Sequence, residues 1–242
     1  MLTPFHFKRF NLLIFFLAIV FQTQSQTDLG SWNIFSAKAS FSERWGGFLE
    51  GQLRSLKFYD NFHYHEIKGG LTYALDKNFS FAVAGGKYDT YLEGGNFVTP
   101  RASDEVRLFE QMTMSQYVHR IKFEHRYRAE QRFTKIGYRN RFRYRLQAIL
   151  PISKAKIQPN SWYLSVSGEV FFTDTPAYFE RIRLYTGIGY QVSKTFGLQA
   201  GYLHQFDYRL IDETGKDFLQ LSFLWDLKFH KNEQERLPTQ ID

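Results

Sequence analysis

Charged residues recur at every second position in two neighbouring stretches of the chain. A guanidinium group binds carboxylates and phosphates, so such an array suits either anion binding or a network of salt bridges. The two stretches carry nine cations and only two carboxylates, and therefore need counter-charges from elsewhere in the chain or from a solute. The first comprises Arg120, Lys122, Glu124, Arg126, Arg128, Glu130 and Arg132, and the second comprises Arg139, Arg141, Arg143 and Arg145.

A β-strand sorts this pattern onto two faces, because successive side chains of a strand point to opposite sides. A helix turns by about 100° per residue and would scatter the charges around its circumference. The faces opposite the charges carry residues such as Phe123, Tyr127, Phe142 and Tyr144. Long strands with one charged and one apolar, aromatic face are typical of a barrel in lipid, whose polar residues face the lumen. We therefore predict an all-β fold, an up-and-down antiparallel transmembrane β-barrel with a strongly charged lumen.

Alternating segments of strand length continue through the rest of the chain, separated by turn residues. Eleven segments are recognisable, but single-chain bacterial barrels have an even number of strands. We therefore favour 12 strands, with 10 as the alternative. Residues 92–103 and 208–216 are expected to form longer polar connections. The segments are 31–41, 45–57, 62–74, 79–91, 104–115, 118–133, 137–150, 161–172, 179–192, 196–207 and 217–229.

The amino terminus has the pattern of a cleaved secretory signal. Lys8 and Arg9 precede an apolar run, and small residues stand before Gln26. The run of about 12 residues is too short for a membrane-spanning helix, which needs about 20. We expect a signal peptide at 1–25, an outer-membrane β-barrel at 26–229 and a flexible polar C-terminal tail at 230–242. The predicted location is the outer membrane of a Gram-negative cell.

Composition narrows the classes of function. The chain has no cysteine, which excludes disulfides, thiolate metal sites and cysteine nucleophiles. Aromatic residues make up 19% of the chain, which suits lipid-facing strands and their interfacial girdles. A nucleic-acid surface would place cations and stacking aromatics on one face, whereas here they lie on opposite faces of each strand. We therefore expect no nucleic acid partner.

The last predicted strand alternates apolar and polar residues and ends with the aromatic Phe229. It is similar to the closing strand of outer-membrane barrels, where a terminal aromatic helps the assembly machinery recognise the chain. The expected partners are therefore outer-membrane lipid and, during biogenesis, the barrel-assembly machinery. Nothing in the sequence identifies a specific protein partner.

Three segments carry a resemblance to a known family. They are Glu124 to Phe133, Tyr138 to Arg145, and Gly201-Tyr202-Leu203. With them the chain resembles the outer-membrane proteins grouped as domain of unknown function 2490. The resemblance implies an outer-membrane barrel over nearly all of the mature chain. It carries over no functional residues, because the family's biochemical activity is not established.

Two roles for the charged face follow from its excess of cations. In the first, carboxylates from other strands close an internal salt-bridge network, and the barrel is structural. In the second, the lumen is a small water-filled passage that favours anions, although a barrel of 10 to 12 strands leaves little open cross-section. A small anionic solute is then a possible partner. The candidate lumen-lining charges are the eleven residues of the two stretches together with Glu50, Glu169 and Asp226.

An outer-membrane lipid-modifying enzyme, a hydrolase or acyltransferase, is the alternative function. It needs a nucleophile, a base and an orienting group at one membrane-level site, and the histidines stand in no such constellation. The pair His63 and His65 is predicted to share one strand face and could hold a metal only with a third ligand. We therefore predict no catalytic residue, no cofactor and no metal site.

Overall fold

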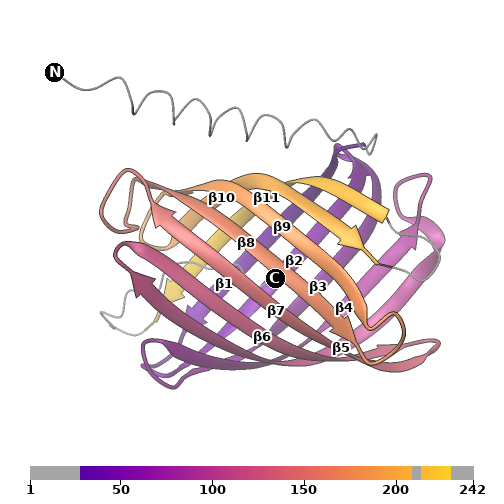
Figure 1. The fold of residues 1–242 in the computed structure, drawn as a ribbon, viewed down its shortest axis with the longest axis horizontal. Helices are drawn as coiled ribbons and strands as arrows, with labels where there is room; N and C mark the ends of the chain where they lie inside the picture. The colour runs from indigo at the N-terminus through magenta and orange to yellow at the C-terminus, as the bar shows by residue number, and fades with distance from the viewer. Residues whose placement is uncertain (1–27, 209–213, 230–242) are drawn as a thin grey trace, which may run out of the picture.

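The computed structural model describes residues 28–208 and 214–229, which form one closed β-barrel of eleven strands (Figure 1). Neighbouring strands in the chain pair antiparallel, and β11 closes the barrel against β1. The described part contains no helix of the length and hydrophobicity that a membrane crossing requires. The strands are β1 (Gly30–Ser40), β2 (Trp45–Lys57), β3 (Asp60–Ala74), β4 (Phe79–Leu92), β5 (Val98–Val118), β6 (Ile121–Thr134), β7 (Gly137–Pro151), β8 (Ser161–Thr173), β9 (Phe179–Gln191), β10 (Phe196–Asp207) and β11 (Thr214–Lys228).

The predicted all-β barrel is confirmed, but the predicted strand count of 12, with 10 as the alternative, is wrong. With an odd number of alternating strands, the first and last strands run in the same direction, and β1 and β11 accordingly pair parallel. Their register is continuous from Gly30 opposite Phe218 to Ser40 opposite Lys228. Both edges are therefore covered without a twelfth strand, because a parallel ladder also pairs the backbone groups of an edge.

Strand β5 is longer than predicted, and the connection before it is correspondingly shorter. Its pairing with β4 continues through irregularities at Tyr91 as far as Val98, so the predicted loop 92–103 shrinks to 93–97. Polar residues in this stretch remain in the sheet because their backbone groups still find partners. The predicted signal peptide at 1–25 and tail at 230–242 lie outside the described residues.

The barrel has two ends, which we name by their connections. The β2–β3, β4–β5, β6–β7 and β8–β9 connections lie at the loop end, where β1 also begins. The β1–β2, β3–β4, β5–β6, β7–β8 and β9–β10 connections lie at the turn end, where β11 finishes. Short connections occur at both ends, so loop length does not distinguish them.

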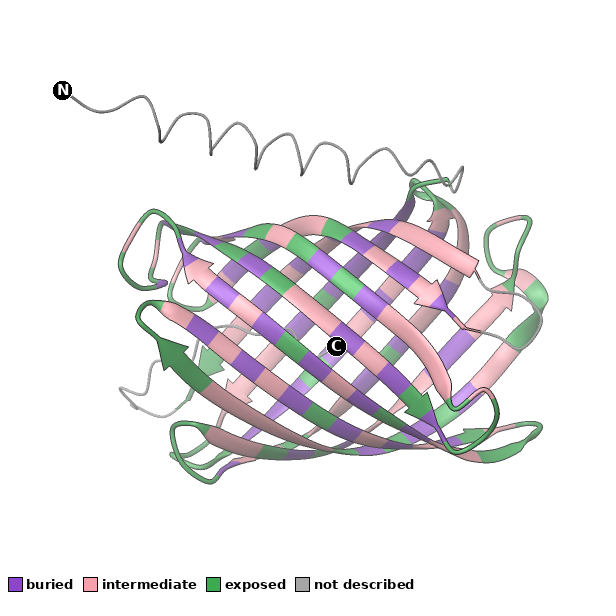
Figure 2. Ribbon diagram, in the orientation of Figure 1, coloured by how far each residue is buried: buried purple, intermediate pink, exposed green. Residues whose placement is uncertain are grey.

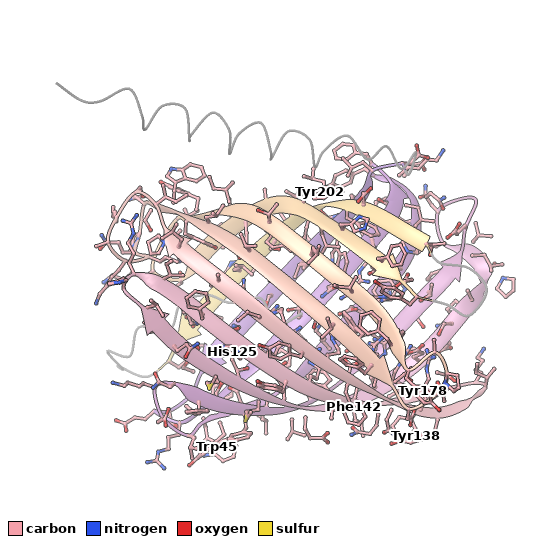
Figure 3. All side chains as sticks on the ribbon, viewed as in Figure 1. Trp45, His125, Tyr138, Phe142, Tyr178 and Tyr202 are labelled. Atoms are coloured by element: carbon pink, nitrogen blue, oxygen red, sulfur yellow. The ribbon has the colours of Figure 1, made fainter. Side chains whose placement is uncertain are left out.

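Burial alternates along the strands, with the charged side chains inside and apolar side chains outside (Figure 2). Val83 is 65% exposed and Phe142 is 52% exposed, although both lie within strands. Figure 3 labels Trp45 near one end of the barrel and Tyr138 and Tyr178 near the other. The outer surface is therefore an apolar wall with aromatic residues toward both ends.

Glycines let two tyrosine rings lie flat against the inner wall. A Cβ added at Gly189 would lie 2.1 Å from the ring of Tyr163, and one added at Gly187 would lie 2.1 Å from the hydroxyl of Tyr185. Both tyrosines are buried, and they fill interior volume beside β8 and β9. These glycines are needed because only a residue without a side chain permits so close an approach.

We predict that Gly189→Ala destabilises the barrel by about 1–3 kcal/mol, because the new methyl group overpacks against the ring of Tyr163. The measurement is the unfolding temperature in detergent, monitored by the difference in gel migration between the folded and the unfolded form. Gly51→Ala is the matched control, because its added Cβ would meet nothing closer than 3.9 Å. Equal unfolding temperatures for the two variants would contradict the packing argument.

Candidate functional site

The predicted charges of β6 and β7 are mostly buried inside the barrel. Arg120 is different, since it lies in the exposed turn between β5 and β6. Arg139 lies at the loop end with 38% of its side chain exposed. Asp226 is half-buried near the turn end. The buried members of the predicted set are Lys122, Glu124, Arg126, Arg128, Glu130, Arg132, Arg141, Arg143, Arg145, Glu50 and Glu169.

Glu130 is held between three arginines in the middle of the barrel. Its Oε2 accepts hydrogen bonds from Nε and Nη2 of Arg141 at 2.8 and 2.6 Å, because β6 and β7 pair these residues directly opposite each other. Its Oε1 accepts one from Arg143 at 2.8 Å and a longer one from Arg128 at 3.5 Å. The side chain is 0% exposed. One carboxylate thus helps neutralise three cations, and losing its charge would leave them undercompensated.

Glu169 plays the same part from β8. Nη2 of Arg126 donates to its Oε1 at 2.5 Å, and Nε and Nη2 of Arg143 donate to its two oxygens at 2.9 and 3.1 Å. Nη1 of Arg183 lies 3.8 Å from Oε2. Because Arg126 belongs to β6 and Arg183 to β9, this carboxylate joins four strands across the interior.

A second network lies on β2 and β3. Nζ of Lys68 is 2.7 Å from both Glu50 Oε1 and Glu66 Oε1, and the amide of Gln52 also donates to Glu50 at 2.7 Å. Of these residues, only Glu50 was among the lumen-lining charges predicted from the sequence. The alternation is present in Glu50-Gln52-Arg54 and in Glu66-Lys68, but each run is too short to stand out.

Aromatic rings connect the two networks. The ring of Trp32 has the guanidinium of Arg54 at 3.4 Å and that of Arg183 at 4.8 Å from its centroid. Phe171 is fully buried and has four guanidinium groups between 4.6 and 5.7 Å from its centroid. Such contacts favour a cation over the face of a ring, so the rings add to the stabilisation that carboxylates give these arginines. The four arginines around Phe171 are Arg141, Arg143, Arg181 and Arg183.

Two cavities lie at opposite ends of this charged centre. The cavity at the loop end, which we call the vestibule, has a volume of 750 Å³. The cavity at the turn end has a volume of 150 Å³ and is lined by Lys38, Lys122, Glu124 and Asp226 among others. No described residue lines both cavities. The salt-bridged centre separates them.

The vestibule contains charged residues that the sequence analysis did not select. Glu105 of β5 accepts from Arg132 at 2.6 and 3.0 Å and from Arg107 at 2.7 Å. Glu180 and Arg181 lie where β9 begins, and Arg181 pairs with Asp207 of β10. Their spacing of two residues was the available signal, as in Glu105-Arg107 and Arg181-Arg183. Arg132 and Asp207 come from other strands than their partners, so sequence spacing alone does not reveal those pairs.

The two histidines predicted to share a strand face are separated by a bulge. Tyr64 pairs with Arg54, and Phe62 pairs with the next residue, Ser55, so that His63 is the extra residue of β3. His63 lines the vestibule, whereas His65 contacts the rings of Tyr91 and Phe97. Across the described ranges no group of three or more His, Cys, Asp or Glu is placed to hold a metal ion.

One histidine outside the vestibule has a carboxylate partner. His204 Nδ1 lies 2.6 Å from Asp217 Oδ1, which also accepts the hydroxyl of Tyr202 at 2.5 Å. A histidine held by a carboxylate is half of a catalytic arrangement. In the part of the chain that the structure describes, no serine or threonine hydroxyl hydrogen-bonds to His204. The sequence missed the pair because its two members lie on different strands.

The comparisons with known proteins agree with the resemblance seen in the sequence. The family described as "Protein of unknown function (DUF2490)" matches residues 29–215, which is more than half of the chain. The chain belongs to this family. No curated protein and no solved structure matches it. The class of protein is thus a closed β-barrel of a family without an assigned function.

We predict that Glu130→Gln lowers the free energy of unfolding by about 3–5 kcal/mol, because three arginines would lose a shared buried charge. The measurement is the free energy of unfolding by urea in detergent, monitored by tryptophan fluorescence. The matched control is Glu110→Gln, since Glu110 is exposed on the outer wall and, among the described residues, accepts a hydrogen bond only from Gln131, at 3.0 Å. The control should change stability by about 0.5 kcal/mol or less. A loss at Glu130 no larger than this would contradict the shared-carboxylate interpretation.

Proposed function

We propose that this protein is an outer-membrane β-barrel whose lumen is closed by its own salt bridges. It would then be a structural, non-conducting barrel with a polar vestibule at one end. The observation that carries the proposal is the salt-bridged layer around Glu130 and Glu169, which separates the two cavities.

The distribution of exposed side chains supports the membrane location. Water-soluble proteins bury their large apolar residues, whereas here leucine, valine and phenylalanine side chains cover the outside and arginine and glutamate fill the inside. A transmembrane barrel has this inverted arrangement, with aromatic residues at its interfaces. The surrounding partner would be outer-membrane lipid, and the barrel-assembly machinery would act during biogenesis.

The geometry of the centre supports closure. Arg126, Arg128 and Glu130 are each at most 2% exposed, and the rings of Phe109 and Phe171 lie against Arg128 and Arg143. An ion crossing this layer would have to separate charges that already satisfy each other, and breaking such buried pairs is costly. A small anion-favouring pore would need the layer to open.

The alternative, a lipid-modifying enzyme, has one supporting observation. His204 and Asp217 supply a base and its orienting carboxylate near the loop end of β10 and β11. The missing element within the described residues is a hydroxyl nucleophile bonded to that histidine. We therefore keep the closed structural barrel as the proposal.

The last strand gives the proposed orientation. If β11 finishes in the periplasm, as the closing strands of such barrels do, the turn end is periplasmic and the vestibule opens outward. A small anionic solute would then reach the vestibule from outside the cell. Because β1 runs parallel to β11, residues 28–29 would also lie on the outer side.

We predict that the refolded protein gives no conductance steps in a planar bilayer, because the salt-bridged layer separates the cavities at the two ends. Folding is checked first by migration on an unheated gel. Steady anion-selective steps that weaken in the double variant Arg141→Gln with Arg143→Gln would instead establish an open pore lined by these arginines.

We predict that peptide tags inserted at Asp28 and after Phe229 lie on opposite sides of the outer membrane, because eleven strands cross an odd number of times. The measurement is antibody labelling of intact and permeabilised cells. The Asp28 tag should be labelled in intact cells and the Phe229 tag only after permeabilisation. Labelling of both tags under the same condition would contradict the odd count or the membrane crossing.

A further inference from the structure

The floor of the vestibule holds a carboxylate surrounded by arginines. Oε1 of Glu180 lies 3.5 Å from Nη1 of both Arg132 and Arg141. Arg139 and Arg181 also act on this carboxylate electrostatically. Two guanidinium groups therefore contact this singly charged carboxylate, and two more line the same cavity.

The contacts of Glu180 are weaker than those deeper in the barrel. Charge-assisted hydrogen bonds are typically about 2.7–2.9 Å long, and the contacts of Glu130 reach that range whereas those of Glu180 do not. Oε2 of Glu180 accepts no hydrogen bond, and 20% of the side chain is exposed. This carboxylate is therefore the loosest counter-charge in the arginine-rich part of the interior, and it borders an open cavity.

We propose that the vestibule binds a small phosphorylated solute, whose phosphate group displaces Glu180 from Arg132 and Arg141 and also engages Arg139 and Arg181, which line the same cavity. A phosphate monoester carries close to two negative charges near neutral pH and offers three acceptor oxygens. Guanidinium groups bind such an anion in bidentate fashion. A second carboxylate would only repeat what Glu180 already supplies, so a dianion is the ligand that gains most from these four arginines.

The rest of the cavity has the size and chemistry for the body of such a solute. Its volume of 750 Å³ lies within the range of about 300–1,000 Å³ that small-molecule sites occupy. Its walls include Tyr91, Tyr208, Thr90 and Gln205, whose hydroxyl, amide and ring surfaces suit a polar, sugar-sized molecule. The ligand class is therefore a phosphorylated small polar molecule.

This inference goes beyond the proposed closed barrel and does not depend on the membrane orientation. Binding is measured in detergent, where neither conductance nor sidedness enters. A conducting barrel could still bind at the vestibule, and a silent barrel could fail to bind. The two proposals therefore fail separately.

Isothermal titration calorimetry of the folded protein in detergent at pH 7.5 tests the inference. The probes are glucose 6-phosphate, the monoanion glucuronate and uncharged glucose. Glucose 6-phosphate is expected to bind at least tenfold more tightly than glucuronate, and glucose is expected to give no signal. Equal affinity for the three probes would overturn the assignment of a phosphate site.

Opposite effects of two substitutions separate a binding site from a purely structural network. Arg139→Gln should weaken glucose 6-phosphate binding about tenfold or more, because a charged donor to the phosphate is lost. Glu180→Gln should strengthen binding about three- to tenfold, because the competing carboxylate is removed. If both variants weaken binding, Glu180 is part of the architecture and the inference fails.

Arg101→Gln is the matched control for Arg139→Gln. Arg101 is 37% exposed in its side chain and ion-pairs with Asp89 and Asp104, but it does not line the vestibule. The change removes the same charge at a similar exposure, so affinity should stay within about twofold of the unmodified protein. An equal loss of affinity in both variants would show only a general effect of net charge and would overturn the site. Unheated gel migration confirms that each variant is folded.

Discussion

Sharing of buried carboxylates between several arginines is the interaction on which the rest of this barrel depends. The buried charges of the described residues include eleven cations but eight carboxylates, so one-to-one pairing is not available. Glu130, Glu169 and Glu105 each serve two or three arginines, and Phe109, Phe171 and Trp32 offer ring faces to guanidinium groups. Because a buried charge without compensation is very costly, the arrangement requires the contributing strands to keep their register.

Closure of the sheet and the chemistry of its interior support each other. A closed barrel has no free edge and gives each strand one face toward an enclosed space. Carboxylates on β8 and β9 reach arginines that lie two or three strands away only because the wall curves around that space. Conversely, contacts such as Arg126 with Glu169, which skip a strand, hold the curvature. The parallel seam between β1 and β11 completes this circle, and Trp32 of β1 anchors the seam to arginines from β2 and β9.

The buried charges are compensated more completely at the centre of the barrel than at the vestibule. Deep in the barrel the carboxylates have short hydrogen bonds and almost no exposure. Toward the loop end Glu180 keeps only long contacts, and Arg139 and Arg181 are partly exposed. Excess positive charge therefore accumulates at the vestibule, which is the basis for proposing anion recognition there rather than anion passage. The apolar outer wall, with aromatic residues toward both ends, would be stable in contact with lipid.

The sequence by itself determined the fold class and the inward face of the charged strands. Alternation at every second residue is a local property of a strand, and on β6 and β7 it runs long enough to be unmistakable. The strand count, the bulge that separates His63 from His65, and the convergence of arginines on Glu180 were decided only by the tertiary structure. These features depend on which strands lie side by side and how they are offset. Pairing between residues far apart in the chain follows from closing the whole sheet, and no local spacing specifies it.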